Sequence, residues 1–274
     1  MEKDMLLLEN IPYGNHERHY LDLFIPDKTV CENGIILFIH GGGWTDGDKT
    51  VHHSDARFFC ERGFVSATMN YRFVADDITV FDELDDITSA LKTIKKECEK
   101  QGLRTEKLLL SGGSAGAHLA LMYAYTRAHE SPLPPVAVCA YCPPFDCTKP
   151  DFLMGNAGEF EDWKNIILSM GSGCKITKAD FMNKQQQDAL FNISPAKYIS
   201  GDCVPTAIFH GRCDELIPID HTYEFLHMLE QNGVENDFIL YENSSHSLLD
   251  DPEAALQAKE MIITYAEKYF NLKS

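Results

Sequence analysis

The feature that most constrains this chain is a regular alternation of short apolar runs with stretches of helical periodicity. The expected strands are residues 19–26, 34–40, 64–71, 107–112, 136–142, 206–211 and 237–243. The expected helices are residues 84–98, 115–129, 219–232 and a final one from about residue 252. Such alternation is typical of an α/β fold, with a mostly parallel central sheet and helices on both faces. A chain of 274 residues can form one domain of this kind, so we expect a single domain over residues 1–274.

Residues 144–200 interrupt the alternation with weak helical patterns and a series of aromatic side chains. These are Phe145, Phe152, Phe160, Trp163, Phe181 and Phe191. A connection this long inside a compact domain is rarely a bare loop. We therefore expect residues 144–200 to form a cap insertion over one edge of the sheet. Its aromatic side chains either pack on the helices of the sheet or line a pocket, and the sequence favours neither.

A Gly-x-Ser-x-Gly pattern lies between an expected strand and an expected helix, in the run Gly-Gly-Ser-Ala-Gly at residues 112–116. Small residues on both sides of Ser114 allow a sharp turn that lifts the serine side chain above the sheet. The helix that follows presents free N–H groups, which favour developing negative charge. We interpret Ser114 as a nucleophile, the alternative being a glycine-rich turn that only closes tightly.

Three consecutive glycines follow the strand at residues 34–40, in the run His-Gly-Gly-Gly-Trp at residues 40–44. Glycines at a strand end cost conformational entropy and add no packing, so a requirement for bare backbone is indicated. An oxyanion hole has that requirement, because its N–H groups must reach a tetrahedral oxygen. We assign the amides of Gly42, Gly43 and Ala115 to it. A phosphate-binding loop is the alternative, but the run lacks the Gly-x-Gly-x-x-Gly pattern and the P-loop Lys-Ser/Thr pair.

A serine hydroxyl needs a base, and in this architecture the expected order along the chain is serine, acid, histidine. His246 lies in a short loop after the last expected strand, on the side of the sheet where the serine turn lies, whereas His221 and His227 fall on a helix. Asp214 closely follows the strand at residues 206–211, so it is our candidate acid. Other acids near this part of the chain are Asp202, Glu215 and Asp220.

Several other residues stand out in the sequence, and we expect structural rather than catalytic roles for them. We expect His118 to point into helix packing and His40 to bind loop backbone. The pair His52 and His53 lies near Asp46, Asp48 and Asp55, a loose grouping for which we expect no bound metal. Cys139 and Cys142 are three apart on an expected strand and lack a second pair, so we expect buried thiols rather than a zinc or redox site.

Charge and cysteine content narrow the functional classes. With 24 Lys and Arg against 42 Asp and Glu, the formal charge is −18, which disfavours nucleic acid and anionic membranes as partners. No apolar stretch approaches the ~18–20 residues of a membrane helix. The short run from Met5 to Leu8 is flanked by acids and is unlike a signal peptide. Nine irregularly spaced cysteines then suggest reduced thiols in the cytoplasm.

Taken together, the glycine run at 40–44, the serine turn at 112–116, Asp214 and His246 resemble the α/β-hydrolase superfamily over roughly residues 19–270. They are most similar to small bacterial carboxylesterases of the feruloyl and acetyl esterase-like group, near the hormone-sensitive-lipase branch. The resemblance implies an α/β-hydrolase fold and a small-molecule ester substrate. It implies Ser114, Asp214 and His246 as the triad and no cofactor. From position, we place Trp44 near the floor of the substrate pocket.

The sequence departs from that branch in ways that leave the substrate open. Gly113 precedes the serine where the branch usually has Asp, Ala117 replaces its second glycine, and too few residues precede His40 for its N-terminal cap. A long-chain lipid substrate is therefore not favoured. Kynurenine formamidases share a similar pattern, so an arylformamidase, an acetylated-sugar deacetylase, a peptidase or a catalytically silent binding protein remain alternatives. A homodimer also remains open.

Overall fold

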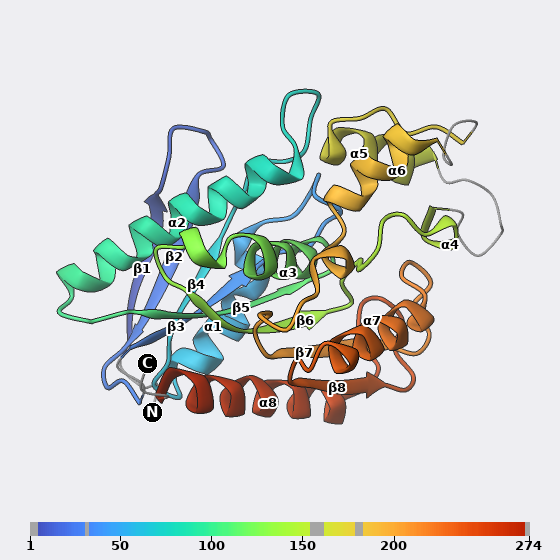
Figure 1. Ribbon diagram of the computed structural model, residues 1–274. Helices are drawn as coiled ribbons and strands as arrows, with labels where there is room; N and C mark the ends of the chain where they lie inside the picture. Colours follow the sequence, from blue (N-terminus) through green and yellow to red (C-terminus); the bar gives the residue numbers. More distant parts are fainter. Residues whose placement is uncertain (1–4, 31–32, 154–161, 179–182, 272–274) are drawn as a thin grey trace.

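An eight-stranded sheet forms the centre of the part of the chain that the computed structural model describes, residues 5–30, 33–153, 162–178 and 183–271 (Figure 1). The strands are β1 (Met5–Pro12), β2 (Tyr20–Pro26), β3 (Gly34–Ile39), β4 (Val65–Met69), β5 (Lys107–Gly113), β6 (Pro135–Tyr141), β7 (Thr206–Gly211) and β8 (Asn236–Tyr241). Their spatial order is β1-β2-β4-β3-β5-β6-β7-β8. From β4 to β8 every pairing is parallel, and only the pairings of β2 are antiparallel. The expected mostly parallel sheet is confirmed.

Helices cover both faces of this sheet. The helices are α1 (His53–Cys60), α2 (Val80–Lys100), α3 (Ala115–Thr126), α7 (Ile219–Gln231) and α8 (Pro252–Asn271), with short 3₁₀ turns at η1 (Lys49–His52) and η2 (Ala128–Glu130). The core cluster on one face includes buried side chains of α2, α3 and α7, and the cluster on the other includes those of α1 and α8. The molecule is therefore a three-layer α/β sandwich, and no described helix is both long and apolar enough to cross a bilayer.

The central strand β3 shows why its sequence forms a strand buried on both faces. Ile35, Leu37 and Ile39 belong to the core cluster of α2, α3 and α7. Ile36 and Phe38, which alternate with them, belong to the cluster of α1 and α8. Successive side chains of a strand point to opposite faces, so a strand covered twice must be apolar at every position.

Two elements of the fold were not expected from the sequence. Strand β1 is an edge strand with an irregular register between Leu8 and Ile11, and its side chains are half-exposed. A half-buried edge strand carries little apolar signal, and the short run of Met5 to Leu8 is all that the sequence shows of it. Helix α1 is a single short helix that buries only Ala56, Phe59 and Cys60. Three apolar positions are too few to reveal a helical period.

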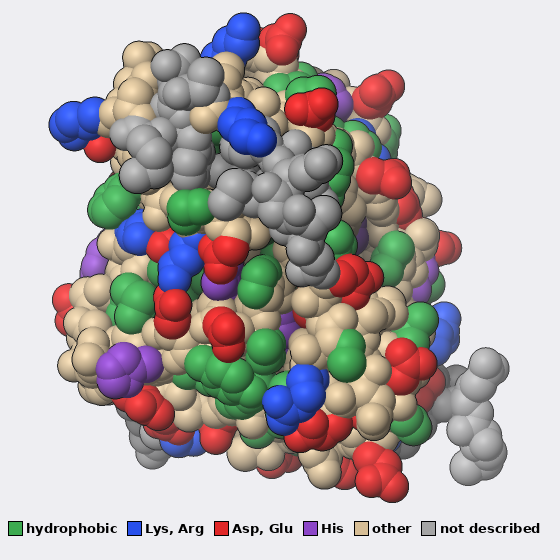
Figure 2. All heavy atoms as spheres, turned by 90° about the vertical axis from the view of Figure 1, so that its right-hand side faces the viewer, with side chains coloured by type: hydrophobic (Ala, Val, Ile, Leu, Met, Phe, Trp, Pro, Cys, Tyr) green, Lys and Arg blue, Asp and Glu red, His purple; other side chains and the backbone are tan. Residues whose placement is uncertain are grey.

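The segment 144–200 contains helical turns that lie beyond the carboxyl ends of the parallel strands, next to the start of α3 (Figure 1). They are α4 (Pro150–Leu153), α5 (Asp162–Ser172), α6 (Lys184–Asn192) and η3 (Pro195–Tyr198). Of the aromatic side chains in this segment, Phe145 and Phe152 are buried, whereas Trp163 and Phe191 are about half exposed. Phe160 and Phe181 lie outside the described residues. Figure 2 shows this end of the molecule, with acidic side chains scattered among hydrophobic ones.

Candidate active site

Ser114 occupies a strained turn between β5 and α3. Its backbone has φ 53° and ψ −119°, a conformation that side chains with a Cβ rarely adopt. The turn is held because the Ser114 amide donates to the Tyr141 carbonyl at 2.7 Å. Gly116 lets α3 approach β3, since a Cβ there would lie 2.1 Å from the Ile39 carbonyl oxygen. The strand-turn-helix context expected around Ser114 is present.

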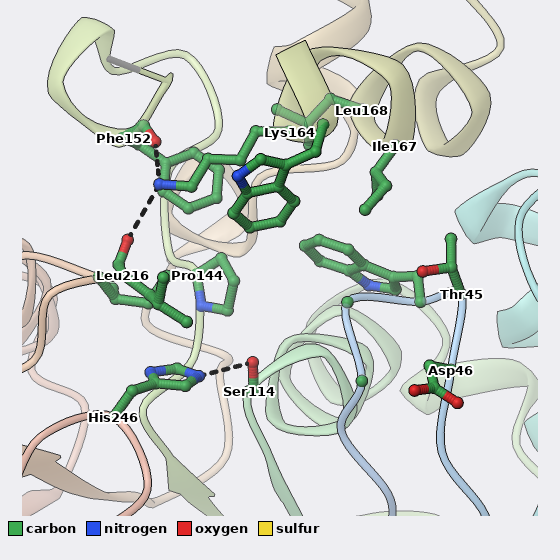
Figure 3. Close-up of a pocket in the computed structure, with 15 residues that line it drawn as sticks. Thr45, Asp46, Ser114, Pro144, Phe152, Lys164, Ile167, Leu168, Leu216 and His246 are labelled. Carbon is green, nitrogen blue, oxygen red and sulfur yellow. Dashed lines mark hydrogen bonds between the residues drawn. The ribbon is translucent and has the colours of Figure 1, made fainter. Parts of the chain in front are cut away.

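Ser114, His246 and Asp214 form one continuous hydrogen-bonded chain, although they are distant in sequence. His246 Nε2 lies 2.9 Å from Ser114 Oγ (Figure 3). His246 Nδ1 lies 2.7 Å from Asp214 Oδ2. The ionised Asp214 can only accept, so Nδ1 carries the proton and Nε2 is left to accept one from the serine. The imidazole is thus held in the tautomer that a general base requires.

Asp214 is buried, yet its surroundings keep it ionised. Its Oδ1 accepts from the amides of Leu216 and Ile217, each at 2.9 Å, and His210 Nε2 lies 3.2 Å from Oδ2. Burial alone would raise the pKa of this carboxyl, but hydrogen bonds from His210 and His246 outweigh that effect and hold the pKa well below its usual range. His210 is a site residue that the sequence did not lead us to expect; its place at the end of β7, four residues before Asp214, is the available signal.

The glycine loop after β3 has the bare backbone expected of it. Gly42, Gly43 and Trp44 are consecutive residues with positive φ, at 115°, 59° and 62°. The Gly42 carbonyl accepts from the amides of Thr45 and Asp46, at 3.1 and 2.9 Å, which closes the loop into a tight turn. Gly42 and Gly43 line the same cavity as Ser114.

Arg18 and His40 hold this loop in place through hydrogen bonds. Arg18 Nη2 lies 3.2 Å from His40 Nε2 and donates to the Gly47 carbonyl at 3.0 Å. His40 Nδ1 lies 2.7 Å from the Gly41 carbonyl oxygen, and its ring stacks on Tyr71. The structural interpretation of His40 is therefore correct. Arg18 was missed, because nothing in the β1–β2 turn signals that it reaches a loop more than twenty residues away.

A cavity of ≈ 430 Å³ opens directly above Ser114 and His246 (Figure 3). Its walls are the glycine loop, the loop after Asp214 and helix α5, and its apolar lining consists of Trp44, Pro144, Phe152, Trp163, Ile167, Leu168, Leu216 and Ile217. Lys164 closes one side, and its Nζ donates to the Phe152 and Leu216 carbonyls at 2.9 and 3.4 Å. Trp44, expected near the pocket floor, is buried in this lining.

A second hollow of ≈ 520 Å³ meets Ser114 and His246 from another direction. Its wall includes the polar side chains of His52, Asp55 and Lys259. The serine hydroxyl and the imidazole therefore lie where two cavities join. A substrate whose reacting carbon carries two substituents could place one substituent in each cavity.

The residues considered for a metal are engaged with separate partners. His52 Nδ1 lies 3.0 Å from Asp55, and His53 Nε2 lies 2.7 Å from Asp22. In the described part of the chain, potential ligand atoms of Cys142, Asp214 and His246 do lie within 4.8 Å of one another. Burial raises the pKa of the Cys142 thiol well above its usual range, and the nearby Asp214 adds to that effect. Asp214 and His246 are engaged in the hydrogen bonds described above.

The fold and this hydrogen-bonded chain at the carboxyl edge of the sheet define an α/β hydrolase. The chain belongs to the BD-FAE family, whose sequence profile matches residues 21–229. A probable isoprenylcysteine α-carbonyl methylesterase, ICMEL1, from Oryza sativa subsp. japonica is 25% identical over 89% of this chain and 58% of its own length. The probable carboxylic ester hydrolase LipM from Mycobacterium tuberculosis is 26% identical over 81% of this chain and 51% of its own.

A solved structure, a truncated carbohydrate esterase from gut microbiota, superposes with a TM-score of 0.79 at 16% identity. The superposition covers 98% of this chain and 97% of the esterase chain. The chain spans only about half to three fifths of the length of the two curated relatives. The likeness in three dimensions, by contrast, extends over almost the whole fold.

Proposed function

We propose that this protein is a serine carboxylesterase that hydrolyses small acyl esters through an acyl-enzyme intermediate. The observation that carries the proposal is the unbroken chain from Ser114 Oγ through His246 to Asp214, with distances of 2.9 and 2.7 Å. These distances are within the reach that proton transfer requires. Membership of the BD-FAE family and the esterase names of the relatives support the same reaction.

In the first half of the reaction, Ser114 Oγ attacks the ester carbonyl while His246 Nε2 accepts the hydroxyl proton. The carbonyl oxygen becomes an oxyanion, which the amides of Gly42, Gly43 and Ala115 would stabilise. Asp214 stabilises the imidazolium without taking its proton. Collapse of the tetrahedral intermediate breaks the bond to the alkoxy oxygen, which leaves as the alcohol after accepting the proton from Nε2.

In the second half, water takes the place of the alcohol. His246 Nε2 accepts a proton from this water, and the hydroxide formed adds to the acyl carbon. The second tetrahedral intermediate then expels Ser114 Oγ, which recovers its proton from the imidazolium. The products are a carboxylic acid and the free enzyme, so no cofactor is required.

The two hollows that meet at Ser114 suit the two arms of an ester. The apolar cavity is small, at ≈ 430 Å³, which favours a short or compact group over a long lipid chain. We also propose that residues 144–200 act as the cap of this single domain. Trp163, Ile167 and Leu168 of α5 supply one wall of the cavity, so this segment would select substrates.

Steady-state kinetics with p-nitrophenyl acetate test the proposal. The wild-type protein should hydrolyse the ester, and Ser114→Ala should lower kcat by roughly 10⁴-fold or more. An unchanged melting temperature would show that the variant is folded. The proposal is wrong if the variant retains activity close to the wild-type value.

The same assay can be run with an aryl formamide, an acetylated sugar and a small peptide at equal concentrations. These substrates represent the alternatives that use the same triad. We expect the highest kcat/KM for the aryl ester. Higher kcat/KM for one of the others would reassign the substrate class while retaining the mechanism.

A cytoplasmic location and a homodimer are further proposals. The described cysteines are all free thiols, which supports a reducing compartment. Fractionation of the producing cells tests the location, and recovery of the protein outside the cytoplasm would refute it.

Sedimentation equilibrium of the purified protein tests the proposed homodimer. A mass equal to that of one chain, 30.9 kDa, would refute it.

A further inference from the structure

A fully buried histidine, His118, lies four residues after Ser114 on α3 and is not part of the hydrogen-bonded chain with Asp214. It contacts two segments that are far apart in the sequence. Trp44 Nε1 donates to His118 Nδ1 at 3.2 Å, and the two rings meet edge to face with centroids 5.0 Å apart. On its other side, His118 Nε2 lies 2.6 Å from the carbonyl oxygen of Ile193.

These partners determine the protonation state of His118 without ambiguity. An indole N–H only donates, so Nδ1 must carry a free lone pair, and a carbonyl only accepts, so Nε2 must carry the proton. The ring is therefore neutral with both nitrogens satisfied. Burial lowers its pKa to about 4, which is consistent with a neutral ring at neutral pH.

Trp44 is the residue through which His118 reaches the site. It follows Gly42 and Gly43 directly and shares their positive φ. Its carbonyl accepts from the Val74 amide at 3.0 Å, and its indole lines the cavity above Ser114. Because the backbone around Trp44 is strained, the hydrogen bond that its indole donates to His118 helps to hold the loop in its observed conformation.

Ile193 follows α6 in the segment 144–200. His118 thus ties together the glycine loop, the helix that begins beside Ser114 and the segment that covers the pocket. We propose that His118 is a positioning residue, which fixes the indole of Trp44 and thereby the oxyanion-binding amides, and couples them to the covering segment. This inference rests on the proposed esterase function.

Both partners of the Trp44–His118 hydrogen bond lie next to the two glycine-containing motifs of the sequence. His118 stands two residues after the Gly-x-Ser-x-Gly pattern, and Trp44 stands directly after the glycine run. Taken separately, the two motifs predict only a packing role for His118 and a pocket position for Trp44. Their hydrogen bond joins the two motifs into one unit.

His118→Phe tests the inference, because it keeps a ring and removes both hydrogen bonds. A displaced oxyanion loop weakens stabilisation of the transition state more than binding of the substrate. We expect kcat for p-nitrophenyl acetate to fall by roughly 10–100-fold, with KM changed by less than about three-fold. His118→Gln, which retains one acceptor and one donor, should recover most of kcat.

Tyr125→Phe is the matched control on the same helix. It removes one partly buried hydrogen bond, between the hydroxyls of Tyr125 and Thr206 at 2.8 Å, and leaves Trp44 untouched. It should lower the melting temperature without changing kcat. A double-mutant cycle of His118→Phe with Trp44→Phe should show strongly non-additive effects on kcat, because both remove the same hydrogen bond.

The outcomes separate this inference from the proposed function. If the wild-type protein hydrolyses no ester, the proposed function fails and the inference fails with it. If the wild type is active and His118→Phe loses stability but keeps its kcat, only the inference is overturned. Additive effects in the cycle, or a His118→Gln variant no better than His118→Phe, would overturn it as well.

Discussion

At the scale of single residues, the ionised state of Asp214 is decisive. Hydrogen bonds to its carboxylate outweigh the effect of burial on its pKa. Two backbone amides fix one oxygen of the carboxylate, and His210 and His246 approach the other. The carboxylate is thereby fixed in place as well as kept charged. It can hold the His246 imidazole in one orientation and one tautomer.

Replacing Asp214 by Asn should therefore lower the activity severely, although the two side chains have a similar shape. The Asn amide group can donate to His246 Nδ1, which leaves the imidazole proton on Nε2, facing the serine. We expect kcat for p-nitrophenyl acetate to fall by about 10³–10⁴-fold. Asp220→Asn, an exposed acid nearby, is the control and should be neutral. Comparable activity of the two variants would show that Asp214 is not the acid.

The residues that could be predicted are those whose chemistry shows in a local pattern. Ser114 and the glycines are marked by their neighbours, and His246 and Asp214 by following a strand. Arg18 and His210 were not predicted, because the contacts through which they act, with His40 and Gly47 and with Asp214, form only in the folded arrangement. A lone arginine in a turn or a histidine at a strand end has many possible roles.

At the scale of elements, helix α5 shapes the apolar cavity with one side only. Ile167 points into the cavity, where its Cδ1 would lie 3.8 Å from a Cβ built on Gly43, whereas the adjacent Ile166 is exposed. This helix was expected only as a weak pattern within an insertion. Its position over the site could not be predicted, because the sequence does not say where an insertion folds back.

Ile167→Ala should enlarge the cavity and favour longer acyl groups. A methylene that fits an apolar pocket contributes about 1–3 kcal/mol to discrimination. We expect the ratio of kcat/KM for p-nitrophenyl hexanoate to that for the acetate to rise by roughly five-fold or more. Ile166→Ala is the matched control and should leave this ratio unchanged. Equal ratios in all three proteins would exclude α5 as a selector of substrates.

Helix α2 contains a buried acid, Glu83, whose two carboxyl oxygens have no hydrogen-bond partner within the described residues. Burial raises its pKa well above the usual range, and the neighbouring Asp86 adds to this effect. The folded protein therefore keeps Glu83 protonated at a pH where the unfolded chain, with a glutamate pKa of about 4.3, is ionised. Stability should fall as the pH rises above that value.

Glu83→Gln removes this dependence because a glutamine side chain does not ionise. The melting temperature of the variant relative to the wild type should increase between pH 5 and pH 8, as measured by thermal unfolding. Glu99→Gln, an exposed site on the same helix, should show no such trend. A difference between Glu83→Gln and the wild type that does not change with pH would contradict the account.

At the scale of the whole molecule, the alternation of strands and helices was sufficient to predict the layers but not the strand order. Strand β4 lies between β2 and β3 in the sheet although it follows both in the sequence. Which strands become neighbours in the sheet depends on how whole elements pack, and no local sequence pattern encodes that packing. The formal charge of −18, by contrast, is a property of composition alone.

That charge should affect the encounter with charged substrates. A negative surface raises the local concentration of cations, and dissolved salt screens this attraction. We expect kcat/KM for a choline ester to fall several-fold, roughly three- to ten-fold, between about 10 mM and 500 mM salt. The value for a neutral ester of the same shape should hardly change. Parallel salt responses for both esters would exclude electrostatic steering.

The most direct test of the central claim is mass spectrometry of the folded protein after reaction with a fluorophosphonate. Such a reagent phosphonylates a serine that a neighbouring base has activated. We predict one adduct, located on Ser114, and loss of that adduct in His246→Ala. An adduct on another residue, or none on the folded wild-type protein, would contradict the claim that these side chains form a working triad.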